Sequence, residues 1–178
     1  SLDSPSIDGF NTYLISEWLQ LSNAAVALSG LGADELFGGY ATFAQVPRLQ
    51  SILRATRFVP PPLRAAAVAA LGRARGRTGA YDKLADLVSG DPSAAGIARS
   101  LRRTVATRSL RAMGLDASAL GLRPDYLDAA SPFLADAPLA DAFNEVSRAE
   151  SAHYMGDTLL RDTDANSMRH SLEVRVPF

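Results

Sequence analysis

The chain has 178 residues, of which 47% are hydrophobic and 21% are charged, an ordinary composition for a soluble globular domain with a core of its own. It contains no cysteine, which excludes disulfides, thiolate metal sites and cysteine nucleophiles. No apolar run is long enough to cross a bilayer, the first residues carry no signal-peptide pattern, and nothing argues against a cytoplasmic location.

The net charge of −1 hides an uneven distribution. Residues 1–47 carry five acids and no Lys or Arg, residues 48–111 carry thirteen basic residues and three acids, and residues 112–178 carry five Arg and eleven acids. A basic block can indicate nucleic-acid binding. Its arginines are spread among alanine-rich segments without a nucleic-acid motif, so we favour charge balance within the fold. We expect neither a nucleic-acid nor a membrane partner.

The first predicted elements are a helix, a strand and a turn. Apolar residues at helical spacing predict an amphipathic helix that begins at Ser4 and Pro5 and ends at about Ser22. The apolar run from Ala24 to Leu28 is typical of a buried parallel strand. It enters a Gly-rich turn at residues 29–32, and a helical pattern resumes over residues 33–37.

The rest of the chain is predicted to be mostly helical. Helices are expected at residues 40–57 (started, kinked or interrupted by Pro47), 63–73, 81–89, 94–106 and 108–113, with a loop at 72–79. Residues 114–138 are irregular, residues 139–169 form a long helix that Gly156 can break, and residues 173–178 are extended. The predicted class is α/β, predominantly helical, with one or two strands. Because this is unusual for an independent domain, and because the chain lacks an initiator Met, we expect it to be part of something longer.

The segment Ser29-Gly30-Leu31-Gly32-Ala33-Asp34-Glu35-Leu36-Phe37-Gly38-Gly39-Tyr40 carries the clearest chemical pattern. A strand that ends in a Gly-rich turn and opens a helix presents backbone N–H groups that suit phosphate. Two carboxylates beside a phosphate would repel it, and Mg²⁺ would resolve that conflict. The alternative is a purely structural strand–turn–helix connection in which Asp34 and Glu35 favour the positive helix end.

A second charged segment covers residues 160–178. Glu173 and Arg175 would point to the same side of an extended chain, which also fits a structural ion-pair network. His153 and His170 have no ligand-like spacing, so we interpret them as structural. No nucleophile–base pair can be assigned, and Lys83, the only lysine, lies in the basic block.

Three segments, residues 5–9 with 11–13, residues 28–40 and residues 157–178, resemble the synthetase domain of glutamine-dependent asparagine synthetases. The second is similar to the family signature Ser-Gly-x-Gly-x-Asp-Glu-x-x-Gly-Gly-Tyr. The third is similar to its Leu-Leu-Arg-Asp-Thr-Asp and His-Ser-Leu-Glu-Val-Arg-Val-Pro-Phe run. Together they cover roughly a third of the chain, in the family's order.

The resemblance implies an adenine-nucleotide α-hydrolase-like (ATP-pyrophosphatase) parallel-sheet domain. It implies a ligase that uses ATP and Mg²⁺ to adenylate the aspartate side chain, after which glutamine-derived ammonia displaces AMP to give asparagine. The ammonia would come from an N-terminal glutaminase domain of the same chain, and a homodimer is one assembly that the resemblance allows. Residues 1–178 would be an internal part of the synthetase domain, with a helical insert at about 41–138. The family's pyrophosphate loop, its catalytic lysine and the downstream end are missing, so we expect the isolated chain to be inactive.

By position, the resemblance assigns ATP contacts to Ser29, Gly30 and Gly32, and Mg²⁺ and pyrophosphate to Asp34. It places Glu35 among the catalytic positions, as support for that loop. Leu31 stands at the catalytic position where many members have Glu, and leucine can act neither as acid nor as base. Ala165 stands where the family commonly has Arg or Lys, so we expect a phosphate or carboxylate contact to be lost there.

Two alternative functions stay open. β-lactam-forming synthetases carry out the same adenylation on a different acid, and Leu31 is compatible with that chemistry. The other alternative is a non-catalytic helical module that only binds a partner. The upstream gene sequence separates them, because a pyrophosphate loop preceded by a glutaminase indicates the synthetase and a start codon at residue 1 indicates the module.

Overall fold

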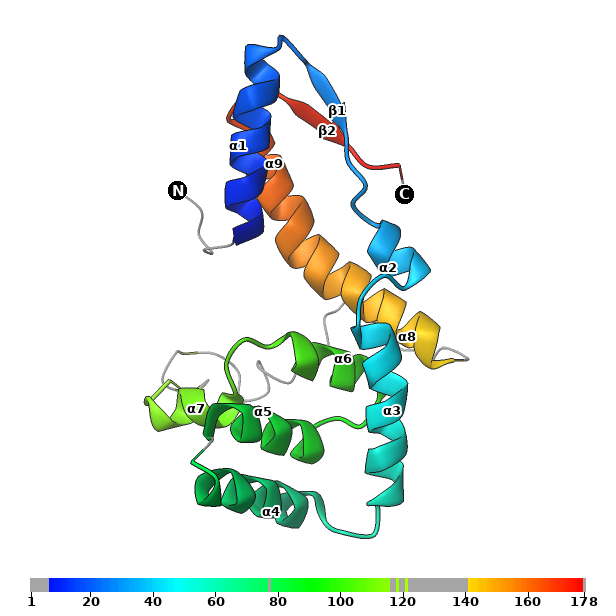
Figure 1. The fold of residues 1–178 in the computed structure, drawn as a ribbon, viewed down its shortest axis with the longest axis vertical. Helices are drawn as coiled ribbons and strands as arrows, with labels where there is room; N and C mark the ends of the chain where they lie inside the picture. Colours follow the sequence, from blue (N-terminus) through cyan, green and yellow to red (C-terminus); the bar gives the residue numbers. More distant parts are fainter. Residues whose placement is uncertain (1–6, 77, 116–117, 119–120, 122–140, 178) are drawn as a thin grey trace. The chain divides into compact units, whose positions relative to one another are not determined.

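The computed structural model describes residues 7–76, 78–115, 118, 121 and 141–177, which belong to two compact units (Figure 1). The first unit consists of Ser1–Tyr40 and Ser147–Phe178, and the second is Ala41–Val146. The insert expected at about 41–138 falls within the second unit. The predicted helix start at Ser4 and Pro5 and most of the predicted irregular stretch lie outside the described residues.

The first unit combines the two ends of the chain. Its elements in chain order are α1 (Ile7–Leu21), β1 (Val26–Leu28), α2 (Ala33–Phe37), the π-helix η2 (Glu150–Leu160), α9 (Arg161–Met168) and β2 (Glu173–Arg175). α1 packs against α9, and α2 contacts η2. This packing brings segments from opposite ends of the sequence together.

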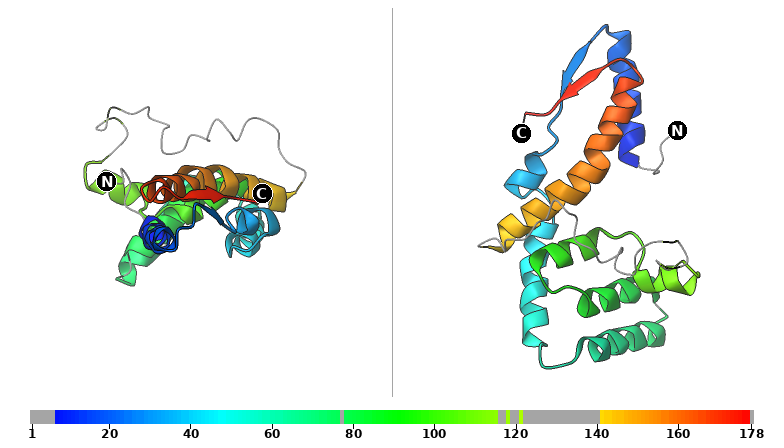
Figure 2. Two further views of the ribbon diagram at one scale, coloured as in Figure 1. Left: turned by 90° about the horizontal axis from the view of Figure 1, so that it is seen from above. Right: turned by 180° about the vertical axis from the view of Figure 1, so that it is seen from behind.

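β1 and β2 form a parallel pair, which is all of the sheet within the described residues. Val26 lies opposite Glu173 and Leu28 lies opposite Arg175. The right-hand view of Figure 2 shows the two strands side by side from behind. Parallel strands end at the same edge of a sheet, so the turn after β1 and the segment after β2 are neighbours. The predicted parallel strand is confirmed, but its predicted burial is wrong, since Leu28 is 82% exposed.

The buried side chains between α1 and the η2–α9 helix are largely polar. Tyr154 donates a hydrogen bond to Asp8 (3.1 Å), and His170 Nδ1 lies 3.0 Å from Gln20 Oε1. The buried polar side chains of these helices are Ser16, Glu150, Asp162, Asn166 and Ser167. Within the described part of the chain, neither carboxylate oxygen of Asp162 has a hydrogen-bond partner, although the residue is only 1% exposed. Burying a carboxylate without a hydrogen-bond partner costs folding free energy, so stability does not explain why an Asp is buried at position 162.

The apolar stripe of α1 is largely exposed. Phe10, Leu14, Trp18 and Leu21 are all exposed, Trp18 to 67%. Val26 and Leu28 of β1 are exposed as well. The helical periodicity of these residues was predicted, but their spacing alone does not tell whether anything covers them. Several large apolar side chains exposed on one helix face are typical of an interface.

The second unit is helical in the described residues. It contains α3 (Thr42–Ala55), α4 (Pro61–Ala74), α5 (Thr78–Ser89), α6 (Ala94–Arg102), α7 (Thr107–Ala112) and the start of α8 (Ala142–Ala149). α4 and α5 meet through Ala65, Ala69 and Ala85, whose small side chains let the two helices approach closely. Ser93 caps α6 by accepting a hydrogen bond from the Gly96 amide (3.0 Å).

Helix boundaries differ from expectation where local signals compete. α4 begins at Pro61, because a proline in the first turn needs no amide partner. α3 continues through Pro47, and α6 ends early because the backbone is extended at Arg103. Of the long helix predicted at residues 139–169, residues 142–168 are helical as α8, η2 and α9, and residues 139–140 lie outside the described residues. Gly156 lies inside the π-helical part without breaking it. Glycine costs about 1 kcal/mol relative to alanine in a helix, which packing can offset.

Within the residues that the structure describes, none of the helices combines the length and the apolar character that a bilayer span requires.

We expect Asp162→Asn to stabilise the chain by about 1–3 kcal/mol, because an amide of similar size costs less to bury than an unpaired charge. This corresponds to a melting temperature higher by about 2–4 °C per kcal/mol for a domain of this size. Asp164→Asn is the matched control, since it changes an exposed carboxylate on the same helix. Thermal melts should show a change within about 0.5 kcal/mol for the control. A lower melting temperature for Asp162→Asn would contradict the inference that its carboxylate is unpaired.

Candidate functional site

The Gly-rich turn lies at the carboxyl end of β1, where the parallel pair also holds it. The Ser29 amide donates to the Arg175 carbonyl (2.9 Å), which continues the strand ladder to the start of the turn. The Leu31 amide donates to the Ser29 hydroxyl oxygen (3.3 Å), and the Ala33 amide donates to the Gly30 carbonyl (3.3 Å). The turn is thus fixed by its own hydrogen bonds and by β2.

Two glycines of this segment are required by the backbone. Gly32 and Gly38 have φ values of 95° and 77°, a region that residues with a side chain rarely adopt. Gly32 precedes α2 and Gly38 ends it, where the amides of Gly38 and Gly39 both donate to the Asp34 carbonyl (3.0 and 2.9 Å). Gly32 was predicted to contact ATP, but its positive φ by itself explains why a glycine occupies this position.

Gly30 has neither of the usual structural reasons to be glycine. Its φ is not positive, and no described atom lies within 4 Å of a Cβ built on it. A side chain would therefore fit at this position in the described chain. A missing side chain on an open turn at the end of a strand allows a ligand to approach the main chain closely.

Asp34 is exposed on α2, and its carboxylate folds over Gly39. A Cβ built at Gly39 would overlap the Asp34 carboxylate. The absence of a side chain at Gly39 therefore leaves the space that the Asp34 carboxylate occupies. Mg²⁺ is usually held by one or two carboxylates, several waters and substrate phosphate oxygens, so one exposed carboxylate beside an open Gly-rich turn fits such an ion. In the described residues, no group of three or more acidic or histidine side chains could hold a metal by itself.

Glu35 points inward and is only 1% exposed. It accepts a hydrogen bond from the Tyr40 hydroxyl (2.7 Å). Burial, and next this hydrogen bond to Glu35, raise the pKa of the Tyr40 hydroxyl. Tyr40 therefore keeps its proton at neutral pH and acts as a donor. The geometry gives Glu35 the role of securing the loop between α2 and Tyr40.

Tyr40 connects this loop to the other end of the chain. Its ring meets the ring of Tyr154 edge-on, with centroids 5.7 Å apart, and Tyr154 in turn donates to Asp8 of α1. Sequence reasoning did not select Tyr154 or Asp8 as site residues. A signal was present, because Asp8, Thr12, Ser16 and Gln20 recur every four residues on α1 and form a polar stripe.

Leu31 is half-buried and Ala165 is exposed. Neither can donate a proton or pair with a charge. These two side chains therefore cannot supply the charged contacts that the resemblance associates with their positions.

The second motif lines a cavity of about 280 Å³ between α9 and β2. Its polar lining comes from Thr163, Asp164, Ser167 and Glu173. The prediction that Glu173 and Arg175 share a side is confirmed, since Arg175 Nε lies 2.8 Å from Glu173 Oε1 and both are exposed. Arg175, chiefly through this hydrogen bond, lowers the pKa of Glu173, and Glu173 raises that of Arg175.

The histidines have structural partners. His170 is buried, lies against Gln20 and meets the Tyr13 ring edge-on at 4.5 Å. His153 Nδ1 lies 3.6 Å from Asp157 of the same helix. Lys83 lies in α5, in the second unit. These contacts agree with the structural interpretation of both histidines.

Comparison with known proteins gives one result. The family model of asparagine synthase matches residues 3–178, which is nearly the whole chain. Neither the curated proteins nor the solved structures contain a significant match. The matched region includes α1, the Gly-rich turn, the helical insert and the β2 segment, and on this ground the chain belongs to the asparagine synthase family.

Proposed function

We propose that this chain is part of an ATP-dependent ligase that adenylates the side-chain carboxylate of aspartate and transfers ammonia to it. In this proposal, the turn at residues 29–39 contacts the phosphates of ATP. Membership of the asparagine synthase family supports a ligase that makes asparagine. The ammonia would be derived from glutamine in a glutaminase domain of the same protein, in the cytoplasm, with a homodimer as one arrangement.

The main support for the proposal is that Gly30 lacks a side chain although the structure has room for one. The backbone and the neighbouring atoms allow a side chain there, yet the sequence has none. A phosphate held by main-chain amides needs such an opening. The Ser29 hydroxyl accepts from the Leu31 amide, which leaves its proton able to donate to a phosphate oxygen.

Asp34 would hold Mg²⁺, which when bound would neutralise charge on the phosphates. The chain's own residues keep that carboxylate in place. Gly39 leaves room for it, the Asp34 carbonyl anchors the end of α2, and Glu35 with Tyr40 fixes the loop that follows. These residues would position the charge before ATP arrives, which limits reorganisation during the reaction.

The exposed apolar faces of α1 and β1 support the proposal that the β1–β2 pair belongs to a larger parallel sheet of the ATP-pyrophosphatase type. Parallel sheets are normally covered on both faces, and their strands read as apolar runs like residues 24–28. Leu28 and Trp18 would be covered by the rest of such a domain.

Leu31 favours a second candidate, a β-lactam-forming relative. An apolar side chain at this position cannot serve as the acid or base of an aspartyl transfer, whereas adenylation of a different acid remains compatible with it. ATP–pyrophosphate exchange with aspartate and with β-amino carboxylates would separate the two. Exchange that depends on aspartate supports the asparagine synthetase, and exchange with only the other acids supports the relative.

We expect Gly30→Ala to leave the fold intact and to weaken ATP binding by the enzyme that contains this chain. The added methyl group meets no described atom, so thermal stability should change by less than about 1 kcal/mol. Ligand contact with the turn should be lost, and the dissociation constant for ATP should rise about tenfold or more. Gly79→Ala in α5 is the matched control, because its Cβ also meets nothing and its φ is not positive. Equal ATP affinity in Gly30→Ala and wild type would remove the turn from the nucleotide site.

We also expect Asp34→Asn and Gly39→Ala to impair the same step for different reasons. The first removes the charge that Mg²⁺ requires, and the second keeps the carboxylate but displaces it. A misplacement of about 1 Å can reduce the rate about a hundredfold. ATP–pyrophosphate exchange should fall in both variants, and excess Mg²⁺ should restore Gly39→Ala better than Asp34→Asn. Wild-type exchange by Asp34→Asn would mean that the turn is only structural.

A further inference from the structure

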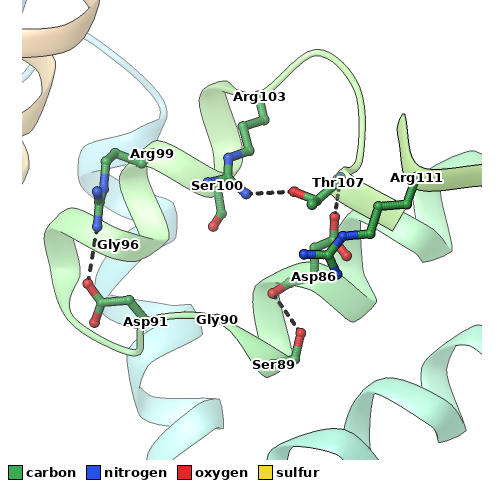
Figure 3. Close-up of a pocket in the computed structure, with 10 residues that line it drawn as sticks. All are labelled: Asp86, Ser89, Gly90, Asp91, Gly96, Arg99, Ser100, Arg103, Thr107 and Arg111. Carbon is green, nitrogen blue, oxygen red and sulfur yellow. Dashed lines mark hydrogen bonds and ion pairs between the residues drawn. The ribbon is translucent and has the colours of Figure 1, made fainter. Parts of the chain in front are cut away.

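The second unit contains a polar cavity of about 320 Å³ that the proposed function does not use. It is bounded by the end of α5, the segment before α6, α6 itself and α7. Figure 3 shows its lining, which includes three arginines, two aspartates and the hydroxyl groups of Ser89, Ser100 and Thr107. A cavity of this size is at the lower limit of small-molecule sites.

Both aspartates form hydrogen bonds with the segments that line the cavity. Asp91 accepts hydrogen bonds from the Ser93 amide (2.9 Å) and hydroxyl (2.7 Å) and from Arg99 Nη2 (3.3 Å). Asp86 Oδ2 accepts from the amides of Thr107 and Arg108. The two carboxylates therefore act as fixed acceptors for backbone groups, and they are oriented by the fold.

The arginines come from three successive segments and give the lining one more positive than negative charge. Arg103, after α6, donates from Nη1 to the Thr107 hydroxyl (3.0 Å), and Arg99 is held by Asp91. Arg111 of α7 is exposed, and no described side chain forms an ion pair or hydrogen bond with it. In Figure 3 its guanidinium turns toward Asp86 at the cavity.

Guanidinium groups beside hydroxyl donors match the oxygens of a phosphate, which can accept paired N–H bonds. We propose that this cavity binds a small phosphate-type anion, either inorganic phosphate or a small phosphate monoester. Arg103 and Arg111 are its cationic contacts, and Ser100 and Thr107 supply hydroxyl donors. The Ser89 hydroxyl is not a donor to the anion, because it donates to the carbonyls of Ala85 and Asp86. This proposal is independent of the nucleotide turn, because it rests on a different unit and on side-chain donors.

Titration calorimetry on the whole protein tests it with inorganic phosphate and, separately, glycerol phosphate as probes. We expect saturable binding in the millimolar range or tighter, with Arg111→Gln and Arg103→Gln each weakening it about tenfold or more. Arg108→Gln is the matched control, since Arg108 lies on the same helix as Arg111 and outside the cavity lining. The two probes tell whether a free anion or an ester is preferred.

Gly30→Ala separates this site from the nucleotide turn, since binding that survives Gly30→Ala and is lost in Arg111→Gln belongs to the cavity. Circular dichroism of each variant shows whether the helices remain, and Arg111→Lys should retain part of the affinity because it keeps the charge. Three results would overturn the proposal: no binding up to about 10 mM phosphate, equal weakening by Arg108→Gln, or succinate binding as tightly as phosphate.

Discussion

The parallel pairing of β1 with β2 is the contact on which the first unit depends. Three residue pairs join segments that are separated by the whole second unit in sequence, and the Ser29 amide extends the ladder into the turn. A short parallel ladder is weak by itself. It is supported by α1 packing on α9, through contacts such as Tyr154 to Asp8 and His170 to Gln20. The position of the Gly-rich turn therefore depends on tertiary contacts between the two ends of the chain.

The first unit buries three acidic side chains and exposes several large apolar ones. Glu35, Glu150 and Asp162 are almost fully buried, whereas Trp18, Leu21 and Leu28 are exposed. Glu35 is satisfied by Tyr40, but the Asp162 carboxylate has no partner among the described residues. Buried polar groups are retained at a cost in stability when they orient a site or await a further group. The pattern fits a unit whose apolar surfaces are interfaces and whose interior holds charge in place.

Sequence reasoning located the elements better than the surroundings of their side chains. The order of helices, the parallel strand and the shared side of Glu173 and Arg175 followed from periodicity and spacing. The exposure of Trp18 did not, because a period of 3.6 identifies an apolar face without identifying what covers it. The bond between Tyr154 and Asp8 spans 146 residues, and the π-helical register of η2 changes which side chains face α1. Some glycines, such as Gly32, are required by a positive φ, and others, such as Gly30, have room for a side chain. The sequence does not give φ values, so it cannot separate the two kinds.

The two proposed anion sites use different physical means, and this has consequences for how each responds to its surroundings. At the turn, the donors are main-chain amides and the nearby charge is negative, so a phosphate there depends on a divalent cation that Asp34 helps to hold. In the cavity, three guanidinium groups that cannot lose their protons near neutral pH outnumber the two aspartates, whose carboxylates are engaged by backbone amides, Ser93 and Arg99, so the proposed anion needs no metal there. Chelation of Mg²⁺ should act on the first site and spare the second, whereas added salt should weaken the exposed Arg111 contact more than the main-chain contacts. Three arginines of the basic block at residues 48–111 line this cavity together with two of the block's three acids.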